Sequence, residues 1–562
     1  MLTITKLKNE TTPAPVIEEI FSRIREEGER PVWISLADKD EAIKRATTLD
    51  RSLPLAGIPF AVKDNFDVAG MPTTAGCPSF AYTPELTAPV VQRLLDAGAI
   101  LIGKTNMDQF ATGLVGVRSP YGACSSVYDS RYISGGSSSG SAVAVAKGLC
   151  AFALGTDTAG SGRVPAAFNN LVGLKPTRGL LSANGVVPAC RSLDCVSVFA
   201  ANATDAEAVW KVAKGPIAPG ADAAPWANGT FRFGVPESSQ LKFFGDDETP
   251  ALFRKAIEKL EAAGGVRETI DFSVFREAAE LLYSGPWVAE RYAAVGEFLQ
   301  SPGEGVNEVV KNIILGGTKY SAVDAYRSAY RLEALKQSAE EQWSRMDVLL
   351  LPTAGTIYRK EAVAGDPVRL NSNLGFYTNF VNLMDLAAIA VPAGFRRDGL
   401  PFGVSLIGRA FSDEGLMVLA GRYLGEPAVP RDTPGCVLLA VVGAHLSGQP
   451  LNHQLTDRGA RLVKTCRTAG DYRMYSLGAK PGLVRDPAFN GWGIEVEVWA
   501  VPENQFGSFV AAVPPPLAIG TLTLEDGASV KGFICEPAAI SNAEEISRFG
   551  SWRSYKAAAA AT

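Results

Sequence analysis

Helical segments alternate with short apolar segments over most of this chain, and no other feature of the sequence limits the possible folds as strongly. A helical pattern over residues 16–27 precedes an apolar strand that begins after Gly57 and ends near Lys63. The segment APVVQRLLDAGAILIGKT then has the pattern of a helix, a stop at Gly98 and a buried strand; the alternation continues through FRFGVP, a helix over 249–263, DVLLLPT and LAAIAVP. We therefore expect an α/β fold with a largely internal sheet covered by helices.

The alternation stops at LGEPAVPRDTPGC, where prolines and charged residues interrupt it. The segments beyond it, VLLAVVGAH, GIEVEVWAVP and TLTLEDGASVKGFIC, are strand-rich and have hairpin patterns. A chain of 562 residues is too long for a single hydrophobic core. We therefore predict an α/β domain over residues 1–425, a linker over 426–436 and a smaller α+β domain over 437–562.

Composition argues against several functional classes. A net charge of −5 does not favour nucleic-acid binding as the main role. No stretch approaches the ~18 consecutive apolar residues of a membrane span, and the N-terminus lacks the apolar core of a signal peptide. The eight cysteines include no CxxC pair, which is typical of reduced thiols in the cytoplasm. We expect a cytoplasmic protein that binds neither nucleic acid nor membrane.

Histidine is the residue type that most restricts the chemistry. The chain has only two, His445 and His453, and both lie in the predicted C-terminal domain. Residues 1–430 alone therefore cannot form a Ser-His-Asp triad, an HExxH metal site or a histidine-rich zinc cluster. A serine nucleophile there needs a carboxylate, a tyrosine or a lysine made neutral by burial. Lys63 is a candidate, although its segment alone also fits a surface lysine.

Residues 135–165, GGSSSGSAVAVAKGLCAFALGTDTAGSGRVP, have the glycine and serine content of a flexible linker, but an apolar run from Ala142 to Leu154 crosses them. That run is long enough for about three helical turns, so we expect a rigid spacer between two tight turns. The GTDTAGSG turn surrounds Ser161 with small residues whose backbone N–H groups can converge on an oxyanion. The GGSSS turn contains Ser137 and offers hydroxyls for a proton relay.

Two other motif matches in the sequence are weaker. GAILIGKT, residues 98–105, fits the phosphate-loop pattern, but its four intervening residues belong in a strand interior rather than a glycine-rich loop. GSSSG, residues 136–140, fits the nucleophile elbow of α/β-hydrolase-type esterases, but the preceding segment is a poor strand and both histidines lie beyond the linker. We retain the esterase only as an alternative.

Five segments resemble the amidase signature family: GIPFAVKDNFDV, GKTNMDQFATG, GGSSSGSAVAVA, GTDTAGSGRVPAAFNNLVGLKPTRG and GVSLIGRAF. They occur in family order within residues 1–425. The resemblance implies the amidase signature fold, an α/β fold with a mixed central sheet covered by helices. It also implies a serine hydrolase with a Ser–cis-Ser–Lys triad, in which Ser161 is the nucleophile, Ser137 the relay and Lys63 the base. The separation of the two serines by 24 positions agrees with the family's spacing. It also implies an oxyanion hole of backbone N–H groups at Thr158, Ala159 and Gly160, with that of Ser161.

Within this family, KTNMDQFATGLVGVRSPYG and LLYSGPWVAERYAAVGEFL resemble the allophanate hydrolases. The implied reaction is hydrolysis of allophanate (N-carboxyurea), which releases ammonia and an unstable dicarboxylated amine that loses carbon dioxide. Tyr283 and Arg291, about two helical turns apart, fit the need for a guanidinium and a neutral donor at the substrate carboxylate. Arg163 is the rival, but we expect a structural role for it. Gln109 is a weaker candidate for the urea-like end.

The C-terminal domain, through VVGAHLSGQPLNHQL, faintly resembles the γ-glutamylcyclotransferase-like fold. It could assist decarboxylation of the first product, with His453 a better candidate than His445, or serve as a dimerisation module or a structural appendage. Two histidines without nearby cysteines or acids do not predict a metal site.

The resemblance as a whole predicts a cofactor-free amidohydrolase that acts on linear C–N bonds in urea degradation, with urea carboxylase as pathway neighbour and homodimer formation left open. The alternatives are an amidase for malonamate or aryl amides, one component of an amidotransferase, and a non-catalytic scaffold.

Overall fold

Contacts within the chain divide it into two units, Met1–Pro427 and Ala428–Thr562. The computed structural model describes residues 1–9, 12–214, 224–426 and 436–560. The predicted linker, 426–436, lies outside the described residues except for its two ends. The two units are described separately below.

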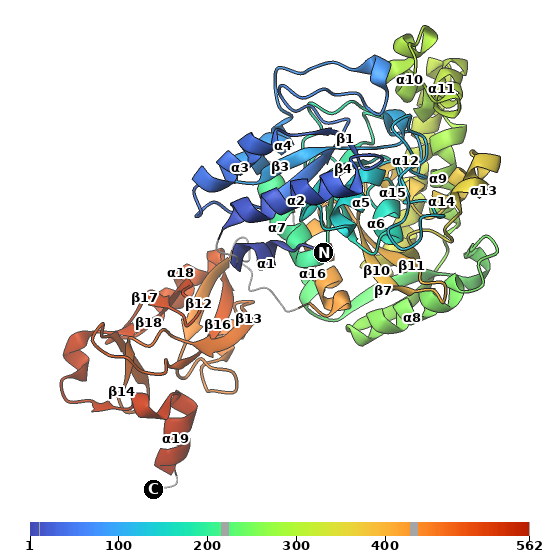
Figure 1. Ribbon diagram of the computed structural model, residues 1–562. Helices are drawn as coiled ribbons and strands as arrows, with labels where there is room; N and C mark the ends of the chain where they lie inside the picture. The colour runs from blue at the N-terminus through green and yellow to red at the C-terminus, as the bar shows by residue number, and fades with distance from the viewer. Residues whose placement is uncertain (10–11, 215–223, 427–435, 561–562) are drawn as a thin grey trace. The chain divides into compact units, whose positions relative to one another are not determined.

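The first unit is built on a mixed sheet, shown enclosed by helices in Figure 1. Within the described residues the sheet has eleven strands in the order β1-β3-β2-β4-β6-β5-β10-β11-β9-β7-β8. The pairs β2–β3, β2–β4, β7–β8 and β7–β9 are parallel, and the remaining pairs are antiparallel. The expected mixed central sheet is therefore confirmed. The strands are β1 (Trp33–Leu36), β2 (Pro59–Lys63), β3 (Ile100–Thr105), β4 (Phe152–Asp157), β5 (Val172–Lys175), β6 (Cys195–Ala200), β7 (Phe231–Pro236), β8 (Gly265–Ile270), β9 (Val348–Pro352), β10 (Ala387–Phe395) and β11 (Pro401–Gly408).

Helices cover both faces of this sheet because its strands are apolar on both sides. In β2, Phe60 and Val62 pack against the helices of one face, whereas Ala61 packs against those of the other. The first face carries α4 (Pro89–Asp96), α7 (Ala203–Ala213), α8 (Thr249–Ala262) and α16 (Asp413–Leu424). The second carries α2 (Pro13–Glu27), α3 (Lys39–Thr48), α5 (Ser139–Ala146), α9 (Ser273–Ser284), α12 (Ala322–Trp343) and α15 (Asn379–Leu383).

The central strands place the residues of interest at one edge of the sheet. Strands β2 and β4 are parallel neighbours, so their carboxyl ends, at Lys63 and Asp157, lie at the same edge. Helix α5 precedes β4 and packs against both strands. The predicted three-turn spacer is shorter than expected: the helix ends at Ala146, Gly148 follows with φ 67°, and the rest of the apolar run enters β4. The spacer is therefore a helix followed by a strand.

The second unit is an α+β domain with two small antiparallel-rich sheets. Its described residues form a five-stranded sheet, β13-β16-β12-β18-β17, and a three-stranded sheet, β15-β14-β19. The predicted hairpin is formed by β17 and β18. The γ-glutamylcyclotransferase-like topology stays a prediction. The elements are β12 (Cys436–Val441), α17 (His453–Thr456), β13 (Arg461–Arg467), β14 (Tyr472–Ser476), β15 (Pro481–Arg485), β16 (Glu495–Pro502), α18 (Glu503–Ala511), β17 (Leu517–Thr523), β18 (Ser529–Cys535), β19 (Glu544–Glu545) and α19 (Trp552–Ala560).

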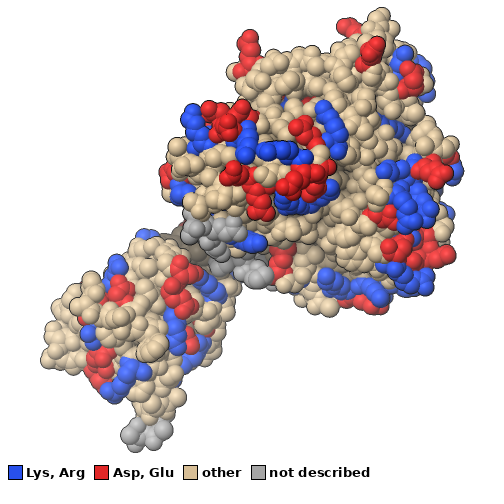
Figure 2. Space-filling view, in the orientation of Figure 1, with Lys and Arg blue, Asp and Glu red and all other residues tan. Residues whose placement is uncertain are grey.

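Charged side chains of both signs share the surface. On the face shown in Figure 2, blue and red residues lie next to one another rather than in a broad field of one sign. This mixing fits the small net charge of −5. Among the described helices, none has both the length and the apolar character needed to cross a bilayer.

Candidate active site

Lys63, the last residue of β2, is fully buried and contacts hydroxyl groups. Its Nζ lies 2.7 Å from Ser137 Oγ and 2.6 Å from Thr156 Oγ1. In the described part of the chain, no carboxylate forms an ion pair with it. An ammonium group removed from water without a direct counter-ion loses much of its stability relative to the neutral amine.

The pKa of Lys63 is lowered to about 7. Burial, which penalises the charged form, is the main cause, and the charge of Arg291 adds to it. The carboxylates of Asp108, Asp194 and Asp157 act in the opposite direction, because they favour the ammonium form. A large fraction of Lys63 is therefore neutral near pH 7, which a proton acceptor requires.

Ser137 is buried in a turn whose backbone is held by a neighbouring loop. The Gly136–Ser137 peptide bond is cis. The backbone N–H of Asp108 donates to the carbonyl of Ser137 (3.0 Å), and that of Gly136 donates to the carbonyl of Leu114 (2.9 Å). The turn that carries Ser137 is thus fixed on the loop that runs from Asp108 to Arg118.

The same loop reaches the second serine. The hydroxyl of Ser161, which is only 3% exposed, donates to the carbonyl oxygen of Gly113 at 3.4 Å. No hydrogen bond joins Ser161 and Ser137 within the described residues. The Ser161 hydroxyl and the backbone of Ser137 both bond the loop 108–118, and a relay between the two hydroxyls requires a rotation of the Ser161 side chain away from Gly113.

Asp157, at the end of β4, organises the turn that leads to Ser161. Its carboxylate accepts hydrogen bonds from the N–H groups of Gly160 (2.8 Å) and Gly162 (3.1 Å). It also pairs with the guanidinium of Arg163 at 2.9 Å, and both side chains are fully buried. These contacts agree with the structural role expected for Arg163, and they give Asp157 a structural role as well.

The same contacts refine the predicted oxyanion hole. Because the Gly160 N–H donates to Asp157, it is engaged in this structure. The N–H groups of Thr158, Ala159 and Ser161 have no acceptor among the described residues. These three remain the candidate donors to an oxyanion, and their small or short side chains leave the backbone accessible.

Tyr283 and Arg291 lie on consecutive helices, α9 and α10 (Trp287–Gln300), rather than on one helix as predicted. Gly285 separates the helices, yet the guanidinium carbon of Arg291 still lies 5.6 Å from the centre of the Tyr283 ring. Arg291 is 3% exposed, and its Nη1 donates to Thr112 Oγ1 at 3.0 Å. Thr112 directly precedes the Gly113 that accepts from Ser161, so the pair lies close to the serines.

Gln109, the weaker substrate candidate, is committed to the fold. Its Nε2 donates to the carbonyls of Gly76 and Gly305, both at 2.9 Å, and its Oε1 accepts the N–H of Asn307 at 2.8 Å. With both ends of its amide engaged, Gln109 connects three segments of the chain and has little capacity left for a ligand.

In the second unit the two histidines have different surroundings. His445 lines a cavity of about 240 Å³, beside Gln454, Lys480 and Phe533. Its Nε2 lies 3.1 Å from Gln454 Oε1, its ring stacks on Phe533, and burial lowers its pKa. His453 Nδ1 instead lies 2.9 Å from the carbonyl of Pro450 near the surface. His445 therefore lines this cavity, whereas His453, the histidine that the sequence favoured, is not among the lining residues.

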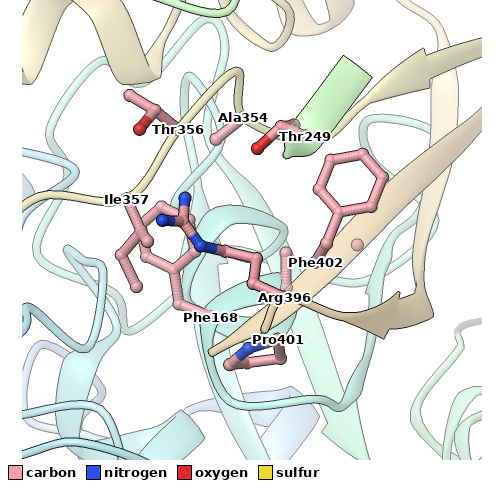
Figure 3. Close-up of a pocket in the computed structure, with 10 residues that line it drawn as sticks. Phe168, Thr249, Ala354, Thr356, Ile357, Arg396, Pro401 and Phe402 are labelled. Carbon is pink, nitrogen blue, oxygen red and sulfur yellow. The ribbon is translucent and has the colours of Figure 1, made fainter. Parts of the chain in front are cut away.

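Figure 3 shows another pocket of the first unit, in which Arg396 lies between Phe168 and Thr356. Its volume is about 10 Å³, which is room for about one water molecule. Arg396 forms an ion pair with Asp246. This pocket is too small for an amide substrate and is lined by residues that stabilise the fold.

Sequence reasoning missed three residues that surround the serines. Thr156 contacts Lys63, Thr112 contacts Arg291, and the Asp108 carboxylate accepts the N–H groups of Val115 and Gly116 at 3.1 and 2.9 Å. Thr156 stands in the quoted GTDT segment, so its position at the end of a strand parallel to that of Lys63 was the available signal. The other two depend on a loop whose path is not visible in the sequence pattern.

Comparisons with known proteins found matches for both units of the chain. The family model described as Amidase matches residues 16–417, and that described as Allophanate hydrolase C-terminal domain matches residues 437–557. The chain is 44% identical over 569 residues to a urea amidolyase of Saccharomyces cerevisiae, a match that covers 93% of this chain and 31% of that protein. The chain thus spans about a third of the length of that relative.

Two further similarities concern proteins of comparable length. A glutamyl-tRNA(Gln) amidotransferase component of Lachnospira eligens is 32% identical over 464 residues, which cover 74% of this chain and 95% of that protein. The solved structure of Kluyveromyces lactis allophanate hydrolase superposes with a TM-score of 0.78 at 41% identity, over 99% of both chains. Given the motifs, the sheet and these matches, the chain belongs to the amidase signature family.

Proposed function

We propose that this protein is an amidohydrolase that converts allophanate to ammonia and carbon dioxide through a serine acyl-enzyme. The observation that carries the proposal is the buried contact of 2.7 Å between Lys63 Nζ and Ser137 Oγ, beside the loop that accepts a hydrogen bond from Ser161. The similarity to the Kluyveromyces lactis allophanate hydrolase over 99% of both chains supports the choice of substrate.

In the proposed acylation step, Ser161 Oγ attacks the carbonyl carbon of the terminal amide. Its proton passes through the Ser137 hydroxyl to neutral Lys63, whose pKa of about 7 suits this exchange. The negative charge on the carbonyl oxygen meets the free N–H groups at Thr158, Ala159 and Ser161.

As the C–N bond breaks, the proton returns through Ser137 to the leaving nitrogen, and ammonia departs. Water then attacks the acyl-enzyme, with the same relay taking its proton. The C–O bond to Ser161 breaks and releases N-carboxycarbamate, which loses carbon dioxide. Each half of the reaction uses the relay once in each direction, so Lys63 ends in its starting protonation state.

The carboxylate at the other end of the substrate needs a cation. We assign it to Arg291 with Tyr283, because Arg291 is buried and forms no ion pair within the described residues. Arg163, in contrast, already pairs with Asp157.

Ammonia release tests the proposal, with Ser161→Ala compared with Ser338→Ala, an exposed helix serine. Allophanate, malonamate, acetamide and biuret serve as substrates. Ser161→Ala should release no detectable ammonia, and Ser338→Ala should release as much as the unaltered protein. An active Ser161→Ala protein would refute the nucleophile assignment, and a preference for acetamide over allophanate would refute the substrate.

Arg291→Ala should raise KM for the carboxylated substrates alone.

The substrate requires a partner reaction that carboxylates urea on nitrogen. We propose an ATP-dependent urea carboxylase as this neighbour, on the basis of the reaction chemistry and of the similarity to proteins named urea amidolyase, of which this chain matches 31%. A homodimer remains a proposal, for which gel filtration with light scattering is the test.

A second activity is proposed for the cavity of the C-terminal unit. This cavity, lined by His445 and Lys480, has room for a small product, and Lys480 can attract a carboxylate. We infer that the unit accelerates loss of carbon dioxide from N-carboxycarbamate. In stopped-flow measurements of released carbon dioxide, His445→Ala should delay its release relative to ammonia, whereas His453→Ala should not. Equal time courses in both variants would leave the unit with a structural role.

A further inference from the structure

A second cavity in the first unit, of about 240 Å³, lies between helices and the loop that holds the serines. Sites for drug-sized ligands measure ~300–1,000 Å³, so this cavity suits a smaller molecule. It is bounded by α9, α10, α11 (Glu308–Leu315) and α14 (Arg369–Leu374). Its polar lining consists of Arg118, Tyr283, Asn312, Lys319, Asn371 and Ser372, and among these described residues two are cationic and none is acidic. The cavity therefore favours an anion.

Arg118 is the unusual member of this lining, because it is a buried cation that is incompletely paired. It is 3% exposed; its Nη1 donates to the carbonyl of Thr112 at 3.0 Å, and its Nη2 donates to the carbonyl of Pro367. Its Nε has no hydrogen-bond partner. Within the described residues no carboxylate forms an ion pair with it. A buried guanidinium without a paired carboxylate is stabilised by an anion placed beside it.

Arg118 also connects this cavity to the proposed catalytic site. Thr112 accepts from Arg118 through its carbonyl and from Arg291 through its hydroxyl, each at 3.0 Å. The next residue, Gly113, accepts from Ser161, and the Arg118 Cδ lies 3.2 Å from the position that a Cβ on Gly113 would occupy. Tyr283 both lines the cavity and lies over Arg291. Two arginines thus meet around one residue of the loop that contacts the nucleophile.

We propose that this cavity is the path and the subsite for the substrate carboxylate, and that Arg118 is a second specificity-determining residue beside Arg291. Arg118 presents its guanidinium charge to the carboxylate at the cavity wall, while Lys319, exposed at the lining, attracts the anion from solvent. The ligand class is a small amide that carries one carboxylate. This inference rests on the proposed function and extends it by naming the route and a residue that the family resemblance did not supply.

The test uses the full chain with Arg118→Met, Lys319→Gln and, as a control for loss of a distant cation, Arg397→Gln. Arg397 has a side chain that is 87% exposed. Arg118→Met should raise KM for allophanate and malonamate at least tenfold more than it raises KM for acetamide. Lys319→Gln should lower kcat/KM for the two anions about threefold and weaken their dependence on salt. Arg397→Gln should match the unaltered protein.

A binding measurement separates this inference from the proposed function. Malonamate is titrated calorimetrically into Ser161→Ala, with and without Arg118→Met or Lys319→Gln. Weaker binding in the double variants supports the inference even if the protein turns out not to hydrolyse allophanate. Unchanged malonamate binding and unchanged KM, in a protein that does hydrolyse allophanate, would overturn the inference and leave the proposed function standing. If Arg118→Met fails to fold, malonamate binding and KM measured in Lys319→Gln, a change at an exposed residue, test the inference instead.

Discussion

Two buried lysines on neighbouring strands of the first unit show how contacts, rather than burial, separate a candidate base from a structural cation. Lys63 ends β2, and Lys104 lies next to it in the parallel strand β3, paired in register with Val62. Both side chains are fully buried, and burial lowers the pKa of both. Burial alone therefore does not distinguish them.

Their partners differ in kind. Lys104 lies 3.5 Å from Asp64 Oδ1 and donates to the Pro72 carbonyl at 2.6 Å and to Thr73 Oγ1 at 2.7 Å. A carboxylate and a carbonyl stabilise the charged form of Lys104, and neither has an O–H group through which a proton could be passed on. Lys63 contacts two hydroxyls, which can both donate and accept, and one of them belongs to Ser137. The Ser137 hydroxyl can pass a proton to Lys63, whereas the Asp64 carboxylate keeps the proton on Lys104.

The largest expected effect comes from removing the amine of Lys63. Lys63→Met should lower kcat for ammonia release by about 10²–10⁴-fold, the range that general-base catalysis contributes, with the fold retained because Met fills the same space. Lys104→Met is the matched control, and its kcat per folded molecule should change by only a few fold. Active-site titration of folded protein in both variants gives the comparison. A Lys63→Met enzyme as active as Lys104→Met would remove the distinction between the two lysines.

Stability should respond in the opposite way. Lys104→Met leaves the buried carboxylate of Asp64 without its cation and should lower the free energy of unfolding by about 3–5 kcal/mol. Adding Asp64→Asn removes that charge and should restore most of the loss. Lys63→Met leaves no paired carboxylate behind and should cost far less, as measured by urea denaturation. Equal losses from the two lysines would show that Lys63 also serves as a structural cation.

These contacts mark the limit of sequence reasoning here. The alternation of helices and apolar strands predicted a covered sheet and most strand positions, because strand interiors such as PFAVK and AILIG carry a strong local signal. The motifs predicted Lys63, Ser137 and Ser161 as site residues, and the structure brings Lys63 and Ser137 into contact. They did not reveal the hydrogen bond between Ser161 and Gly113 or the placement of Thr112 between two arginines. Such contacts form between segments far apart in the chain, where local propensity carries no information.

The apolar run after Ser141 shows a related limit. Helix and strand are hard to distinguish in a continuous apolar segment, and the sequence favoured one helical spacer. In the structure, the turn at Gly148 divides the run, and its second half pairs with β2 and β6. Tertiary pairing placed Thr156 beside Lys63, and this contact could not be inferred without the correct division.

The pH dependence should carry the signature of Lys63. With a pKa of about 7, kcat/KM for acetamide should rise about tenfold per pH unit below that value and level off above it. Because the charge of Arg291 contributes to lowering this pKa, Arg291→Met should move the midpoint to higher pH. A midpoint that stays in place or moves to lower pH would show that another group controls the profile.

The same shift has a consequence for stability. Lys63 has a lower pKa in the folded protein, about 7, than its ordinary value of 10.5. Between these values the unfolded chain binds the additional proton, so this group destabilises the fold at low pH and the penalty shrinks as pH rises from about 7 towards 10.5. In Lys63→Met, the free energy of unfolding should therefore rise less steeply with pH over this window than in the unaltered protein.

The smallest expected effect compares the threonine partners of the two lysines. Thr156→Val removes the hydroxyl 2.6 Å from Lys63 Nζ, and Thr73→Val removes the one 2.7 Å from Lys104 Nζ. Both changes preserve shape. Thr156→Val removes one hydrogen bond and Thr73→Val removes two, because Thr73 Oγ1 also donates to the Phe66 carbonyl at 3.3 Å, and each lost bond should cost about 0.5–1.5 kcal/mol of stability. Only Thr156→Val should lower kcat, by about three- to tenfold, because it frees the amine of Lys63 to move away from Ser137. Equal kcat values for the two variants would mean that Ser137 alone positions the amine, and Thr156 would then belong with Thr73 as a purely structural partner.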